Sequence, residues 1–206
     1  MKRMALINDL SGFGKCSLTA AIPVISVMGI QACPLPTAIL SAQTGFEHYF
    51  CDDYTDKMRA YIGKWIELGL DFDAISTGFL GSAEQIEIVL EFVEHFREED
   101  TLIIVDPVMG ATSGAKLLKD EALQALTQQL LPLAEVCTPN IPEAEILSGM
   151  RITSAEDMVA AAKIISERYG CAVLCKGGHA INDANDLLWK DGEVVWFRGQ
   201  RINNPN

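Results

Sequence analysis

Short apolar runs alternate with longer segments of helical periodicity along this chain, and that alternation constrains the fold more than any other feature. The apolar runs have the length of buried strands and occupy residues 4–7, 32–38, 74–77, 102–105, 136–138, 172–175 and 194–197. The segments between them carry apolar residues at three- and four-residue spacing, which is typical of amphipathic helices. Alternating strands and helices build a sheet covered by helices, so the sequence predicts an α/β fold with a mostly parallel central sheet.

Three of the predicted helices have recognisable ends. One begins at Ser82, where Ser-Ala-Glu-Gln forms a capping-box pattern before a periodic apolar run. A second starts near Ser154 and stops at Gly170, the residue type that most often ends a helix. A third runs from about Asp120 until Pro132 ends it.

Length and composition narrow the class of protein. The chain has 206 residues, enough for one substantial domain with a full core, so residues 1–206 are expected to form a single domain. A hydrophobic fraction of 49% excludes disorder as the main state. Acidic residues outnumber basic ones 28 to 16, and no basic cluster offsets the net charge of −12, which disfavours nucleic acids and anionic membranes as partners.

The expected location is the cytoplasm. The first residues carry only a short apolar stretch before Asn8 and Asp9, unlike a signal peptide, and no apolar run is long enough to cross a membrane. The six cysteines are scattered, several of them inside apolar runs. They are interpreted as reduced packing residues and not as disulfides or a zinc site.

Polar residues follow several of the predicted strands. Ligands of open α/β sheets bind beyond the carboxyl ends of the strands, so these positions are the candidates for a site. Asp9 and Asp106 follow two strands directly, and Glu143 comes shortly after a third. A single aspartate there is usually a turn former or a helix cap, whereas three acids on one edge favour a cation or polar-ligand site.

The segment TPNIPEAE, residues 138–145, allows two interpretations. Asn140 as N-cap, Pro142 in the first turn and Glu143 reaching back fit a capping box. The same polar groups also fit a ligand or ion site at the end of a strand. The two interpretations are compatible, because a capping residue can also face a metal.

The remaining motifs favour phosphate chemistry. Residues 9–16 fail the P-loop pattern, since Asp9 and Cys16 replace a required glycine and a required Ser or Thr. Lys176 ends a strand and precedes two glycines, which suits a polyphosphate, although a surface lysine before a turn is the simpler alternative. No Ser/His/acid or Cys/base arrangement stands out. Acids, threonines and backbone amides remain, and phosphoryl transfer needs mainly these.

Four stretches of the sequence resemble one family. INDLSGFGKCSLTAAIPVISVMGIQACPLPTAILSAQTGF (residues 7–46) resembles the amino-terminal part of pyridoxal/pyridoxamine kinases of the ribokinase-like superfamily. VDPVMG, LLPLAEVCTPNIPEAEILSG and VLCKGGH are similar to the same family and equally to the hydroxymethylpyrimidine kinases. The likeness covers essentially the whole chain, and residues 7–46 are its most specific part.

The resemblance implies a three-layer α/β/α sandwich, ATP with Mg²⁺, often K⁺, and a homodimer. It implies transfer of the γ-phosphate to the 5′-hydroxymethyl group of a B6 vitamer. Substrate contacts would then come from Asp9, Thr44 and Phe79, and the metal would be held by Glu143 and Asp106. The resemblance also implies a group of residues near ATP, namely Asp106, Thr138, Asn140, Lys176 and Gly178.

Two departures keep alternatives open. Ala111 stands where pyridoxal kinases often have an acid, and the loop GATSGAKLL is closer to the pyrimidine kinases, so a hydroxymethylpyrimidine kinase is the near alternative. The glycine-rich catalytic turn of the family is expected after Asn206, so no catalytic residue is assigned within residues 1–206. A non-catalytic ligand-binding module is therefore the alternative from another functional class.

Overall fold

The computed structural model describes residues 1–110, 119–177 and 184–199, which form two compact units. The first unit comprises Met1–Leu133 and the second begins at Ala134. The strands and helices of the first unit are β1 (Arg3–Ser11), α1 (Ser17–Val27), β2 (Gln31–Leu40), β3 (Cys51–Asp53), α2 (Thr55–Glu67), β4 (Ala74–Thr77), α3 (Ala83–Phe96), β5 (Leu102–Val105) and α4 (Asp120–Ala125). Those of the second are β6 (Val136–Cys137), α5 (Ile141–Ser148), α6 (Ala155–Tyr169), β7 (Ala172–Cys175), β8 (Asp186–Lys190) and β9 (Glu193–Phe197).

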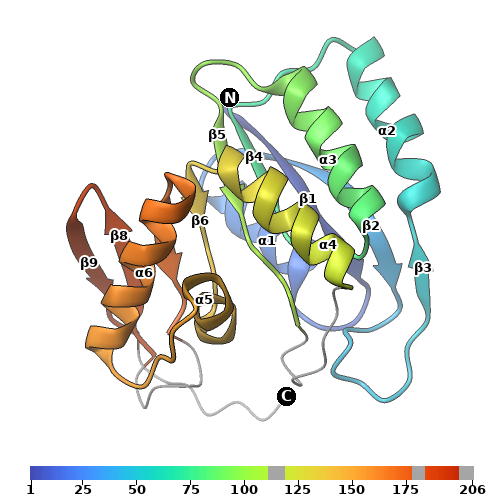
Figure 1. Cartoon of the computed structure of the whole chain (residues 1–206). Helices are drawn as coiled ribbons and strands as arrows, with labels where there is room; N and C mark the ends of the chain where they lie inside the picture. Colours follow the sequence, from blue (N-terminus) through green and yellow to red (C-terminus); the bar gives the residue numbers. More distant parts are fainter. Residues whose placement is uncertain (111–118, 178–183, 200–206) are drawn as a thin grey trace. The chain divides into compact units, whose positions relative to one another are not determined.

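The first unit has three layers (Figure 1). Its strands lie in the order β3-β2-β1-β4-β5, and all pairs are parallel except the edge pair β2–β3. On one face, Met4 and Leu6 of β1 pack on Leu18 of α1. The helices α2, α3 and α4 lie side by side on the other face, where Phe92 and Phe96 stack with ring centroids 4.5 Å apart. The predicted α/β fold with a mostly parallel sheet is confirmed.

The second unit is smaller. Strands β6 and β7 are parallel, whereas β7–β8 and β8–β9 are antiparallel. Helix α6 packs on β7 and β8 and covers the fully buried side chains of Val173, Cys175 and Leu187. Among the described residues, no helix is both long and apolar enough to cross a membrane.

The helix ends show where the local sequence pattern was sufficient to predict the capping contacts. Helix α6 begins with a capping box between Ser154 and Asp157 and ends at Gly170 in the left-handed conformation, as predicted. At α3, Ser82 caps the Gln85 N–H, but the Gln85 side chain accepts the Gly81 N–H, so the predicted reciprocal half of this box is wrong. Gln85 is drawn away because its amide also donates to the buried Thr37 carbonyl at 2.9 Å.

Other boundaries differ from the prediction. The helix expected to stop at Pro132 continues from α4 through a π-helical turn, Leu126–Leu130, and a 3₁₀ turn, Leu131–Leu133, that contains the proline. Strand β6 ends at Cys137, so Thr138 lies just beyond it. Strands β3 and β8 were not predicted. The three residues of β3 are exposed and carry no apolar alternation, which explains why it was missed.

Candidate functional site

Asp9 lies in an irregularity of β1 and not after the strand. The parallel register between β1 and β2 shifts between Asn8 and Leu10, and β1 continues to Ser11. The expectation that Asp9 directly follows a strand is therefore wrong. A bulge of this kind redirects a side chain. The Asp9 carboxylate is only 8% exposed and accepts the Ser11 hydroxyl at 3.2 Å.

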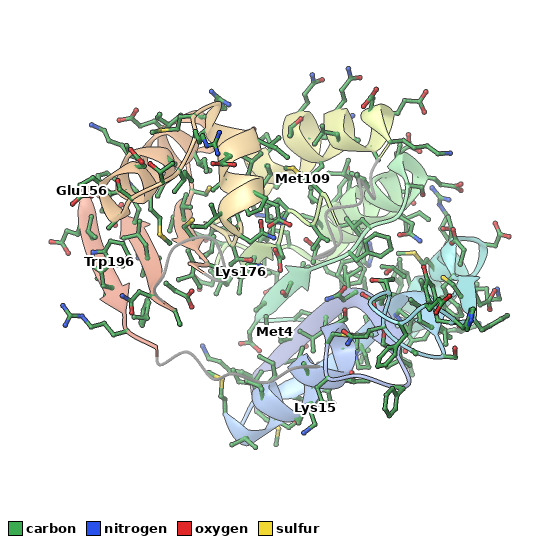
Figure 2. The ribbon with its side chains drawn as sticks, turned by 90° about the horizontal axis from the view of Figure 1, so that it is seen from below. Met4, Lys15, Met109, Glu156, Lys176 and Trp196 are labelled. Atoms are coloured by element: carbon green, nitrogen blue, oxygen red, sulfur yellow. The ribbon has the colours of Figure 1, made fainter. Side chains whose placement is uncertain are left out.

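A cavity of about 360 Å³ opens beside Asp9 in the first unit. It is lined by the bulge of β1 and by the segments that follow β2, β4 and β5. Four residues singled out from the sequence meet there, namely Asp9, Thr44, Phe79 and Asp106. Lys15 lies on the loop between β1 and α1 (Figure 2), and the next two residues, Cys16 and Ser17, line the cavity.

The loop that carries Phe79 is fixed by side chains of β1 and β2. Asn8 Oδ1 accepts the Phe79 N–H at 2.8 Å, and the Thr37 hydroxyl donates to the Phe79 carbonyl at 2.9 Å. Thr37 is completely buried. The position of the Phe79 ring is therefore set by residues of β1 and β2.

The cavity is also lined by residues that the sequence did not single out as site residues, among them Ser11, Gln43, Tyr49 and Cys51. Gln43 stands next to Thr44 and could have been noticed. Tyr49 and Cys51 carry no signal in the sequence, because only the antiparallel pairing of β3 with β2 brings their segment to the cavity.

The thiols of Cys51 and Cys175 show no sign of nucleophilic activation. Burial raises the pKa of Cys51, and nearby carboxylates, including that of Asp9, raise it further. In the second unit, burial is the main cause that raises the pKa of Cys175 to about 12. All six cysteines lie within the described residues, and none of them forms a disulfide. Cys51 and Cys175 are therefore neutral at physiological pH.

The second unit brings Asn140, Glu143 and Lys176 together. Asn140 Oδ1 accepts the Glu143 N–H at 2.9 Å, and Glu143 Oε2 accepts the Asn140 N–H at 2.8 Å. The predicted capping box is thus confirmed. Asn140 also forms a parallel bridge with Lys176, which follows β7 (Figure 2) and whose N–H donates to the Pro139 carbonyl at 2.8 Å. Thr138 is half-buried. Gly178 lies outside the described residues.

The residues of this cluster fit a magnesium ion held mainly through phosphates and water. In the part of the chain that the structure describes, no group of three or more His, Cys, Asp or Glu side chains is arranged to hold a metal. Mg²⁺ commonly uses only one or two protein carboxylates and keeps several waters. Glu143 is 3% exposed and accepts the Asn140 N–H through Oε2. Its carboxylate suits that mode of binding and does not suit a dedicated metal cage.

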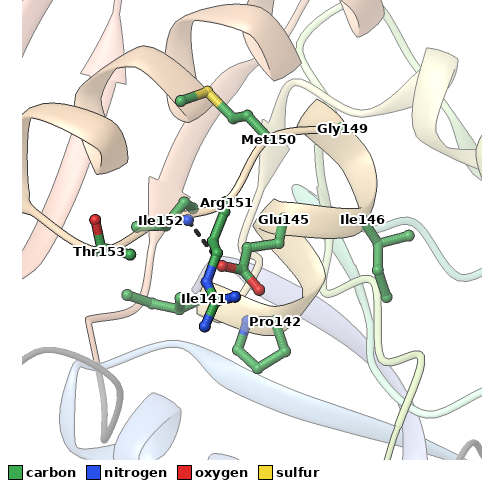
Figure 3. A pocket seen from close by; sticks show the side chains of 9 residues that line it. All are labelled: Ile141, Pro142, Glu145, Ile146, Gly149, Met150, Arg151, Ile152 and Thr153. Carbon is green, nitrogen blue, oxygen red and sulfur yellow. Dashed lines mark hydrogen bonds between the residues drawn. The ribbon is translucent and has the colours of Figure 1, made fainter.

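A wider groove of about 740 Å³ runs along α5 and the segment after it (Figure 3). It is lined by Ile141, Pro142, Glu145, Ile146, Gly149, Met150, Arg151, Ile152 and Thr153. Its lining includes Glu145, whose Oε1 accepts the Ile152 N–H at 2.7 Å. Neither Asn140 nor Glu143 lines it. The groove is therefore not formed by Asn140 or Glu143, the two site residues predicted nearby.

Comparison with known proteins identifies the family. The sequence profile described as phosphomethylpyrimidine kinase matches residues 14–206. The chain belongs to this family. It is 42% identical over 134 residues to a hydroxymethylpyrimidine/phosphomethylpyrimidine kinase of Haemophilus influenzae, a match that covers 63% of this chain and 49% of the relative. The chain thus spans about half the length of that relative.

Solved structures of this family and of pyridoxal kinases share the fold. A candidate phosphomethylpyrimidine kinase of Bacteroides thetaiotaomicron, crystallised in a form with pyridoxal, is 34% identical with a TM-score of 0.83 over 95% of this chain and 72% of that one. An ADP complex of Bacillus subtilis pyridoxal kinase is 27% identical with a TM-score of 0.85 over 100% of this chain and 78% of that one. The resemblance to pyridoxal kinases, close to the pyrimidine kinases, is confirmed.

Proposed function

We propose that the protein is an ATP-dependent kinase that phosphorylates the 5′-hydroxymethyl group of a B6 vitamer and gives the 5′-phosphate. The observation that carries this proposal is the cavity that gathers Asp9, Thr44, Phe79 and Asp106. Its volume of about 360 Å³ is at the small end of ligand sites, which suits a single substituted ring. The Bacteroides relative crystallised with pyridoxal supports the choice of ring.

In this proposal the residues of the first unit bind the ring. The buried Asp9 carboxylate accepts a hydrogen bond from a ring substituent, Phe79 forms an aromatic wall, and Thr44 contributes its hydroxyl at the mouth. Asp106 serves the phosphate and metal end of the site. A carboxylate that accepts a hydrogen bond gives a strong and directional contact, so Asp9 fixes the orientation of the ring.

The residues of the second unit serve the nucleotide. Lys176 supplies a positive charge to the phosphates, and Thr138 and Asn140 lie near ATP. Glu143 serves the binding of Mg²⁺, which when bound neutralises charge on the phosphates. K⁺ and a homodimer also remain part of the proposal on the strength of the resemblance. A single domain and a cytoplasmic location remain part of it on the strength of the length and the residue pattern of the sequence.

A second candidate function is a hydroxymethylpyrimidine kinase, which the name of the Haemophilus relative favours. Both substrates present a hydroxymethyl group on a six-membered nitrogen ring, and they differ in the other ring substituents. A coupled assay of ADP release with pyridoxal and with hydroxymethylpyrimidine separates the two. We expect the higher kcat/KM with pyridoxal, and a clear preference for the pyrimidine contradicts the B6 assignment. Binding without turnover of either compound supports a ligand-binding module instead.

A further inference from the structure

Asn8 connects the two walls of the cavity through a single oxygen atom. Its Oδ1 accepts the N–H of Asp9 at 2.9 Å and the N–H of Phe79 at 2.8 Å. The first bond spans neighbouring residues and the second spans 71 positions of the sequence. The acid of the β1 bulge and the aromatic residue after β4 are therefore tied to one side chain.

Gly78 makes room for this connection. A Cβ atom at Gly78 would lie 2.2 Å from Asn8 Nδ2 and 2.3 Å from Asn8 Cγ, far inside van der Waals contact. Gly78 does not have a positive φ, so another residue could adopt its backbone conformation. Glycine is required at this position because the Asn8 side chain lies against it, and not because the chain turns there.

The alternatives for placing Asp9 and Phe79 are weaker. Thr37 donates to the Phe79 carbonyl, and among the described residues no hydrogen bond joins its side chain to Asp9. Ser11 donates to the Asp9 carboxylate at 3.2 Å, a long bond between hydroxyl and carboxylate oxygens. The bulge at Asn8–Leu10 interrupts the regular pairing of β1 with β2, so a side-chain acceptor takes over at the Asp9 N–H.

We infer that Asn8 is a positioning residue for the ring-binding cavity, which places the Asp9 carboxylate and the Phe79 ring relative to each other. This inference rests on the proposed function. Asn8 itself lines the cavity, and its Oδ1 accepts the N–H groups of Asp9 and Phe79, the two residues that touch the ring in the proposed function. Ring affinity therefore depends on Asn8, whereas nucleotide affinity does not.

The first test measures the two hydrogen bonds and the affinity for the ring in the full chain. In Asn8→Ala, the Asp9 and Phe79 amide protons are expected to exchange at least about tenfold faster, measured by NMR. Calorimetry is expected to show roughly tenfold to hundredfold weaker pyridoxal binding, from the loss of two hydrogen bonds, with ATP affinity within about twofold of wild type. Thr37→Val is the matched control, since it releases only the Phe79 carbonyl and is expected to weaken pyridoxal binding less.

The second test uses the close approach of Gly78. Gly78→Ala displaces the Asn8 side chain and is expected to reproduce the loss of pyridoxal affinity. In an Asn8→Ala background the space is free, so the same change is expected to alter affinity by less than about twofold. Such a dependence on the background is not expected if Gly78→Ala merely destabilises the fold.

The outcomes separate this inference from the proposed function. The positioning role is overturned if the Asp9 and Phe79 amide protons exchange at the same rate in Asn8→Ala as in wild type. It is also overturned if Gly78→Ala lowers pyridoxal affinity equally in the wild-type and Asn8→Ala backgrounds. Equal losses of pyridoxal and ATP affinity overturn it as well and indicate a general structural role. If wild type binds neither pyridoxal nor hydroxymethylpyrimidine while both amides still respond to Asn8→Ala, the proposed function fails and the placement of the two residues by Asn8 stands.

Discussion

The candidate site residues of the two units are held in place in different ways. In the first unit, Asn8 and Phe79 are joined by a hydrogen bond across 71 positions, and Thr37 and Phe79 by one across 42. In the second, Asn140 and Glu143 hold each other through two bonds across three positions. The first arrangement exists only once the sheet has formed, whereas the second is a property of one helix end. The geometry of the cavity beside Asp9 and Phe79 should therefore respond to substitutions far away in the sequence. The geometry of Asn140 and Glu143 should respond to substitutions close by in the sequence.

The largest expected effect is at Asp9. Asp9→Ala should weaken pyridoxal binding by about 1.5 to 3 kcal/mol, because a charge-assisted hydrogen bond from the ring is lost. Asp9→Asn keeps an acceptor for the Ser11 hydroxyl and should retain part of the affinity. ATP affinity should not change in either variant. Calorimetric titrations with both ligands check this, and equal losses of both would place Asp9 outside a ring-specific site.

The next effect concerns the charge of Glu143. Glu143→Gln keeps an oxygen that can accept the Asn140 N–H but removes the charge that attracts Mg²⁺. Nucleotide affinity at saturating Mg²⁺ should fall by about tenfold, as expected for one lost charge contact, while the melting temperature stays nearly constant. The reverse result, a lower melting temperature with unchanged Mg²⁺ dependence, would make Glu143 only a helix cap.

A smaller effect distinguishes Asn140, a helix cap with a proposed role in nucleotide binding, from Ser154, a helix cap without such a role. Asn140 and Ser154 both begin helices of the second unit with capping boxes. Asn140→Ala and Ser154→Ala should each cost about 1 kcal/mol of unfolding free energy in urea titrations. Only Asn140→Ala should also weaken nucleotide binding. A similar loss of binding in Ser154→Ala would mean that stability alone explains the effect at Asn140.

The smallest effect is the pH dependence of the α6 cap. Hydrogen bonds from the Thr153 N–H and hydroxyl, and then from Ser154, lower the pKa of Asp157 below its ordinary value of 3.8. A carboxylate whose pKa is lower in the folded state stabilises the fold above the unfolded pKa and loses that contribution as pH falls through the folded one. The melting temperature of wild type should exceed that of Asp157→Asn at neutral pH. The difference should begin to shrink below the ordinary pKa of 3.8 and disappear below the lowered pKa of the folded state. A difference that persists unchanged in acid would show that the charge of Asp157 does not contribute.

Much of the fold follows from local patterns. The predicted strands β1, β2, β4, β5 and β7 and the helix from Ser154 to Gly170 match the structure because burial and capping there depend on neighbouring residues. The Ser82 box failed in one half because Gln85 reaches Gly81 and Thr37, and Thr37 lies 48 positions away. The edge strand β3 and the cavity residues Tyr49 and Cys51 depend on pairing with β2, which no local pattern indicates.

The sequence by itself determined the α/β class, the positions of Asp106 and Lys176 directly after strands, and the Asn140–Glu143 box. Each follows from residue type and from contacts within one turn or one strand. Only the tertiary structure decided that Asp9 lies in a bulge, that Asn8 links it to Phe79, and that Gly78 is needed for the close approach of Asn8. The physical reason is that these contacts arise from the register of β1 against β2 and β4, and strand register is a relation between distant segments.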